Sequence, residues 1–280
     1  MTVRQPAVAG QFYPGRREDL ELSVDTLLAH ARPAAEATAL PPPKALIVPH
    51  AGYIYSGLTA AFAYALLEPI RAQIRRVALL GPAHYVAFSG VALSPAEAFM
   101  TPMGRVPLDR ALESSLLALP QVLESAQAHA PEHSLEVQLP FLQRVLDDFT
   151  LVPLVIGNAS THEVAAVIEA CWGGPETLVL ISSDLSHYLP YATAQAMDAD
   201  TVRRILDLNW PLLEQTACGA RGVNAMMVAA TSHQLRPTLI DFRNSGDTGG
   251  DRDRVVGYAS IAFTNGVSAL RAAADNDEAG

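Results

Sequence analysis

The chain has 280 residues, of which 50% are hydrophobic, and this is enough apolar material to bury the core of one large domain. Its formal net charge of -10 argues against a nucleic-acid partner, because binding to phosphates needs clustered Lys and Arg side chains. The sequence predicts neither a secretory signal nor a membrane span, since it lacks a run of about 18 apolar residues. We therefore expect a cytoplasmic protein that binds neither nucleic acid nor membrane.

The first half of the chain alternates between apolar runs and helical patterns. Residues 31–44 are rich in Ala and Pro and are interpreted as a linker between an N-terminal helix and the first core strand. Apolar runs at 44–50 and 76–82 lack polar alternation, which is typical of strands that are covered on both faces. A helical pattern at 56–70 separates them. Residues 91–109 contain several Pro and Gly residues and predict short strands or an insertion.

The second half continues this alternation and then changes character. Pro140 is expected to kink or split a helix at 134–149, because proline cannot donate a hydrogen bond to the preceding turn. Residues 236–264 predict an antiparallel pair of strands joined by a polar loop. The remaining elements are predicted strands at 151–157 and 177–184 and predicted helices at 161–172, 192–206 and 222–235. Alternating strands and helices favour a single α/β domain with a central, mostly parallel (mixed) sheet flanked by helices.

Ligand-type side chains follow three of the predicted strands. His50 ends the first apolar run, His84 lies shortly after the second, and Asp184 and His187 follow the run that begins at 177. In open parallel sheets, ligands gather outside the carboxyl ends of the strands. A lone histidine at such a position often only caps a turn, but three coincident strand ends favour a metal or catalytic site. Two imidazoles and one anionic ligand would leave open positions on a metal for water or substrate.

These patterns leave the third ligand open. Asp184 or Glu136 would complete a two-histidine, one-carboxylate set of the kind that holds non-haem iron, whereas Cys218 would make a softer site. Cys218 directly precedes a predicted helix, where a thiol ionises easily, although a buried apolar role is the simpler interpretation. We expect Cys171 and Cys218 to be free thiols. His133 and Glu136 lie three residues apart, so on a helix they would share a face and could hold a metal, relay a proton or form a surface hydrogen bond.

Six motifs together resemble those of the Memo family. They are PHAGYIYSG, GPAHY, EHSLEVQLPF, SSDLSHY, TACGARG and VVGYAS, which occur in the family's order between residues 49 and 260. The amino-terminal PAVAGQFYP also matches, so the resemblance covers nearly the whole chain. It implies a single domain over 1–270, followed by a flexible tail at 271–280. The implied fold is like that of class III extradiol ring-cleaving dioxygenases.

The same resemblance implies roles for individual residues. His50, His84 and Cys218 are implied as metal ligands, and Asp184 and His187 as residues that line the same pocket. The extradiol enzymes use a glutamate where this chain has Cys218, and a thiolate favours softer ions. Fe(II) or copper is therefore expected, with zinc as an alternative. Prokaryotic members imply a radical-SAM protein as a partner, and this arginine-rich, lysine-poor chain is typical of a prokaryotic protein.

Functions of different classes fit this set of residues. The first is a metal-dependent oxidoreductase for a small substrate, in which His187 acts as acid or base. Asp184 would fix the tautomer of His187, provided that the two side chains face one another. Its pocket would have a wall of tyrosines, formed by Tyr53, Tyr55 and Tyr85. The second is a non-catalytic module that binds a protein or peptide and retains the cleft. A zinc-dependent hydrolase with Glu136 or His187 as its general base is a third interpretation.

Overall fold

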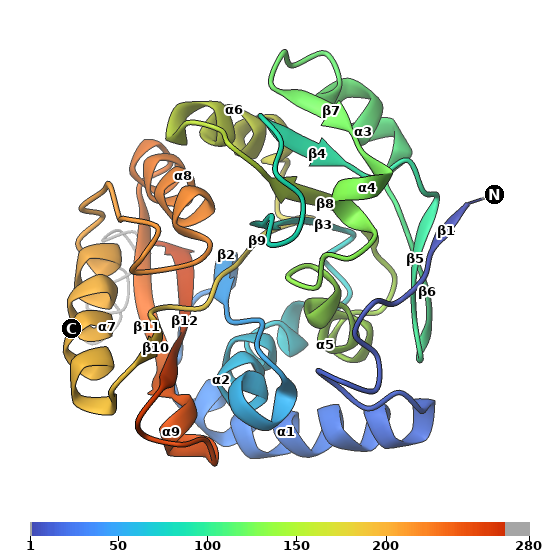
Figure 1. Ribbon diagram of the computed structural model, residues 1–280. Coiled ribbons are helices and arrows are strands. Elements are labelled where there is room, and N and C mark those ends of the chain that lie inside the picture. Colours follow the sequence, from blue (N-terminus) through green and yellow to red (C-terminus); the bar gives the residue numbers. More distant parts are fainter. Residues whose placement is uncertain (1, 267–280) are drawn as a thin grey trace, which may run out of the picture.

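Four parallel strands form the centre of the computed structural model, which describes residues 2–266 (Figure 1). In spatial order they are β2 (Pro43–Val48), β9 (Thr177–Ser182), β3 (Arg76–Pro82) and β8 (Thr150–Ile156). Successive residues of a strand point to opposite faces, so Leu46 and Val48 pack in one hydrophobic core and Ala45 and Ile47 in another. Both faces are buried, and this explains why these strands appear in the sequence as continuous apolar runs.

Antiparallel strands extend this centre on both sides into a nine-stranded mixed sheet. Beside β2 lies β12 (Val255–Asn265), which pairs with β11 (Leu235–Asn244) and, at its start, with β10 (His187–Leu189). Beside β8 lies β4 (Val91–Leu93), which pairs in parallel with β7 (Val122–Glu124). The antiparallel pair predicted at 236–264 is confirmed, as is the mixed α/β sheet.

A separate three-stranded sheet holds the N-terminal segment against the main body. It contains β1 (Val3–Arg4), β5 (Ala98–Thr101) and β6 (Gly104–Pro107), with β1 parallel to β5. The short strands predicted at 91–109 are therefore present. This sheet places residue 4 beside the segment that leads to one of the candidate site histidines.

Helices cover both faces of the main sheet (Figure 1). On one face lie α1 (Arg17–Ala37), α2 (Tyr53–Ala65) and α5 (Leu139–Val145). On the other lie α6 (Thr161–Cys171), α7 (Tyr191–Leu206) and α8 (Ala220–Ser232). The shorter elements are η1 (Glu68–Ile70), α3 (Arg110–Leu116), α4 (Ala126–His129), η2 (Glu136–Gln138) and α9 (Ser245–Thr248). Within residues 2–266, none of these helices combines the length and the apolar character needed to cross a membrane.

Pro33 and Pro140 have different effects on their helices in the structure. The linker predicted at 31–44 is wrong over its first half, because α1 continues to Ala37 with Pro33 inside it. The buried row that ends in Ala31 anchors this helix on the core, and the following Ala-rich turn favours helix despite the missing proline donor. The predicted split at Pro140 is confirmed, since Pro140 lies in the first turn of α5, where its missing N–H removes no helical hydrogen bond. The tail predicted at 271–280 lies outside the described residues.

Candidate metal centre

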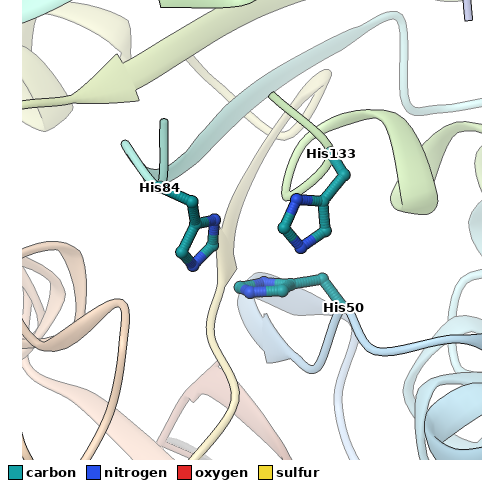
Figure 2. Close-up of side chains that lie close together, drawn as sticks. All are labelled: His50, His84 and His133. Carbon is teal, nitrogen blue, oxygen red and sulfur yellow. The ribbon is translucent and has the colours of Figure 1, made fainter. Parts of the chain in front are cut away.

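Three histidines from separate parts of the chain converge at the carboxyl end of the central strands (Figure 2). His50 and His84 each lie two residues beyond the end of their strand, β2 and β3, and His133 lies in the turn before η2. One ring nitrogen from each histidine is within 4.8 Å of those of the other two. This distance allows a shared metal ion, because ligand bonds of about 2.1 Å can meet between them. The predicted convergence of His50 and His84 is confirmed.

Hydrogen bonds fix which nitrogen of His50 is free. Its Nδ1 lies 2.8 Å from Ser182 Oγ, and that hydroxyl donates its proton to the carbonyl of Ser134 at 2.7 Å. Because the hydroxyl proton is used there, Ser182 must accept from His50, and Nδ1 carries the imidazole proton. The lone pair of His50 is therefore on Nε2, the nitrogen that can bind a metal.

Glu132 orients the ring of His84 in the same way, and this residue was not predicted from the sequence. The carboxylate accepts from the His84 backbone N–H at 2.7 Å and from Nδ1 at 2.9 Å, which leaves Nε2 of His84 free. Burial raises the pKa of Glu132, but the hydrogen bonds from His84 and from the Ser134 amide outweigh it and lower the pKa to about 2. An ionised carboxylate behind a ligand histidine is the usual outer-shell arrangement of metal sites. Its position next to His133 in the sequence gives no hint of a partner 48 residues away.

His133 is held differently from the other two histidines. Its ring stacks on that of His84 at 4.7 Å and meets the edge of Phe12 at 4.7 Å. Its Nδ1 is buried without a hydrogen-bond partner, and the Glu132 carboxylate lies 3.5 Å away. The shared helix face predicted for His133 and Glu136 is wrong, because the helix is broken and His133 precedes its first turn.

Glu136 points away from the histidines. Its carboxylate is fully buried, pairs with Arg4, and accepts from the Ala7 and Val8 amides and the Tyr13 hydroxyl. These partners occupy both oxygens, and Glu136 does not line the cleft that contains the histidines. The structure therefore does not bring it to the position of a third ligand or of a general base.

Cys218 lies beside this cluster. Its Sγ is 3.4 Å from Nε2 of His50 and accepts from the Asp184 amide at 3.3 Å. A nitrogen and a sulfur bound to one metal at about 2.1 and 2.3 Å are roughly 3.6 Å apart in a tetrahedral site, so the spacing to His50 fits a shared ion. Cys218 is nevertheless not part of the group of ligand atoms that all lie within 4.8 Å of one another, and it lines a neighbouring pocket instead of the cleft. Burial raises the pKa of the Cys218 thiol, and the charge of Asp184 adds to this effect. Without a metal the sulfur is protonated, and its predicted ligand role requires loss of that proton.

Asp184 and His187 line the same cleft as the three histidines, but they do not pair with each other. Asp184 Oδ1 accepts from the His50 backbone N–H at 2.7 Å, and burial raises the pKa of this carboxyl. His187 Nδ1 lies 2.9 Å from the carbonyl of Leu185. A carbonyl can only accept, so Nδ1 is protonated and Nε2 is free to take a proton. The prediction that Asp184 fixes the tautomer of His187 is wrong, because Leu185 does so.

The cleft itself has a volume of about 650 Å³ and aromatic walls. Tyr55 and Tyr85 line it as predicted, together with Tyr188 and Tyr258. Tyr53 does not line it, since this side chain is buried and its hydroxyl donates to the carbonyl of Val137. The cleft is thus large enough for a small aromatic molecule beside the histidines.

Burial keeps two of the three histidines in the form that metals bind. Burial lowers the pKa of His50 well below its ordinary value, and burial also lowers the pKa of His133. Both imidazoles are therefore neutral at pH 7, with a lone pair available. Three imidazoles, an outer-shell carboxylate and an adjacent thiol form a donor set that suits zinc, iron or copper.

Comparison with a solved structure supports the fold. An uncharacterized protein of Escherichia coli K12 superimposes with a TM-score of 0.50 and 14% sequence identity, over 79% of this chain and 99% of that chain. At this identity the likeness concerns the fold alone. It agrees with the α/β architecture that was expected from the sequence.

Sequence comparison gives a closer relationship. The family model described as "Memo-like protein" matches residues 4–262. A MEMO1 family protein of Aquifex aeolicus is 37% identical over 94% of this chain and 100% of the relative, and one of Ignicoccus hospitalis is 37% identical over 94% and 99%. A third, from Metallosphaera sedula, is 33% identical over 94% and 99%. The family model and these relatives show that the chain, with the motifs around its three histidines, belongs to the Memo family.

Proposed function

We propose that this protein is a metal-dependent oxidoreductase that acts on a small substrate with iron or copper. The observation that carries the proposal is the convergence of three imidazoles, two of which have Nε2 left free by hydrogen bonds on Nδ1. His50 and His84 serve as ligands, and either His133 or Cys218 serves as the third. A divalent ion held there would act as a Lewis acid and, if it is iron or copper, as a carrier of electrons.

The protein's own residues supply the proton chemistry. His187 accepts or delivers a proton through Nε2, because Nδ1 is engaged by Leu185. Asp184 holds the His50 backbone in place through its Oδ1 and keeps that histidine directed at the cleft. Tyr55, Tyr85 and the other aromatic side chains of the wall bind the substrate and exclude water from it.

A zinc-dependent hydrolase is the second candidate, because the same donor set also suits zinc. Three histidines are a common protein ligand set of catalytic zinc, with the fourth position open for water. His187 lines the same cleft and would serve as the general base. Glu136 is not available for this role, because Arg4 and Tyr13 occupy it.

Elemental analysis of protein purified without oxygen and without a metal-affinity tag tests the proposal. About one iron or copper per chain, with an absorption change when dioxygen or a substrate is added, supports the oxidoreductase. About one zinc per chain with hydrolytic turnover supports the second candidate. Protein without a stoichiometric metal contradicts both, and would instead favour a binding module that retains the cleft, with a radical-SAM protein among the partners to test.

A further inference from the structure

Arg4 and Glu136 form an ion pair behind the three histidines. Arg4 comes from β1 and Glu136 from η2, and their side chains are 6% and 0% exposed. Charges buried to this degree are costly unless every donor and acceptor is satisfied. The other partners of these two side chains therefore show what the pair holds in place.

The remaining donors of Arg4 bind the backbone that leads to His133. Its Nε donates to the carbonyl of His129 at 3.0 Å, and a terminal nitrogen donates to the carbonyl of Glu132 at 2.6 Å. This stretch between α4 and η2 belongs to no helix or strand. A planar guanidinium with its donors in a fixed fork thus ties together an irregular turn that carries one candidate ligand and the outer-shell Glu132.

The remaining acceptors of Glu136 bind the N-terminal segment. They take hydrogen bonds from the Ala7 amide at 2.7 Å, the Val8 amide at 3.0 Å and the Tyr13 hydroxyl at 2.5 Å. Phe12, one residue before Tyr13, packs against the ring of His133 and lines the cleft. The ion pair is therefore connected to His133 from two sides, through the backbone before it and through the aromatic ring beside it.

His133 depends on such outside support more than the other two histidines. His50 and His84 are each oriented by a hydrogen bond on Nδ1, whereas Nδ1 of His133 has no hydrogen-bond partner among residues 2–266 and lies 3.5 Å from the Glu132 carboxylate. Its ring is held by its backbone, by the ring of Phe12 and by stacking on His84 at 4.7 Å. Arg4 binds the backbone before His133, and Glu136 binds the N-terminal segment that carries Phe12.

We propose that Arg4 and Glu136 are positioning residues, which together hold the turn that places His133 and the outer-shell Glu132 at the metal centre. This inference rests on the proposed metal-binding function. It assigns a role in the site to a residue at the start of the chain, 132 positions from its partner.

Cobalt(II) titration of the full chain, followed by visible absorption, tests the role of Arg4. Arg4→Met should weaken cobalt binding about 10- to 100-fold, the range found when outer-shell partners are lost, and should change the d–d bands. Arg4→Lys should fall between Arg4→Met and wild type, since an ammonium can pair with Glu136 but cannot reproduce the fork. Arg76→Met is the matched control, because it breaks an ion pair with Asp109 at 2.7 Å that has no contact with the cleft. Unchanged cobalt affinity and bands in folded Arg4→Met would overturn the proposal.

Amide hydrogen exchange without metal tests the same role independently of metal binding, and a double variant covers the case in which Arg4→Met does not fold. If Arg4→Met does not fold, the double variant Arg4→Met/Glu136→Gln removes both buried charges and takes its place. Amide hydrogen exchange over 129–136 is then compared without metal in wild type, variant and control. Faster exchange in this turn supports the positioning role, and unchanged exchange overturns it. Wild-type protein that takes up no cobalt would contradict the proposed function itself, which the exchange result cannot do.

Discussion

Replacement of Glu132 by glutamine is the most direct perturbation of the candidate metal centre. The carboxylate accepts three hydrogen bonds, from the backbone and Nδ1 of His84 and from the Ser134 amide. Glutamine has nearly the same shape but only one oxygen, so on one side its amide group must face a donor. If the amide faces Nδ1 of His84, the ring proton moves to Nε2 and blocks the lone pair that would bind a metal.

The expected loss follows from this outer-shell role. Removing such a partner weakens metal binding about 10- to 100-fold, which corresponds to about 1.4 to 2.7 kcal/mol. The assay is competition for zinc or cobalt against a chromophoric chelator at pH 7.5, with circular dichroism as the check on folding. Glu113→Gln is the matched control, because Glu113 is a buried glutamate with an arginine partner away from the cleft. Equal affinities of folded Glu132→Gln and wild type would refute the tautomer argument.

Three further predictions concern the ligand set, pH and packing. Cys218→Ser should lose most bound metal in elemental analysis while Cys171→Ser keeps it; full occupancy in both would leave His133 as the third ligand. Burial lowers the pKa of His129 to about 4, so below about pH 6.5 the unfolded chain binds a proton that the folded protein does not. Through His129, unfolding stability should therefore fall by about 3 kcal/mol from pH 6.5 to pH 4. The lowered pKa values of His50 and His133 act in the same direction, so denaturant titration of His129→Gln should show a slope that is reduced by this amount. Gly257→Ala should lower the melting temperature, since its Cβ would lie 1.9 Å from Asp198 Oδ2; an unchanged melting curve would contradict this close contact.

The sequence predicted the parts of the site that follow regular elements. His50 and His84 could be found because each comes directly after an apolar run, and such runs identify strands without knowledge of their partners. Glu132 and Arg4 could not be found in this way. Their partners are 48 and 132 residues away, in a loop and in the short helix η2, so no periodicity of the sequence links the members of each pair.

His133 and Glu136 were wrongly placed on one helix face, because the apolar periodicity of their segment predicts a longer helix than the structure contains. The apolar pattern at 134–149 is that of one helix, and on one helix His133 and Glu136 would share a face. Pro140 begins a new helix instead, and the tighter turn before it directs Glu136 into the core toward Arg4. The local sequence correctly predicted helical structure with a break at Pro140, but the pairing of buried charges determines where Glu136 points.

The order of the central strands has a consequence for how this protein can change. β9 lies between β2 and β3, so the strands that deliver His50 and His84 are two steps apart, or about 10 Å. The last residue of β9, Ser182, contacts the His50 ring, and Asp184, two residues beyond the strand, accepts from the His50 backbone. The backbone hydrogen bonds of the sheet therefore fix the distance between the strand ends that carry His50 and His84. Insertions and substitutions in the segment 246–254 at the rim of the cleft would alter which molecules enter, while the spacing of the metal ligands stays the same.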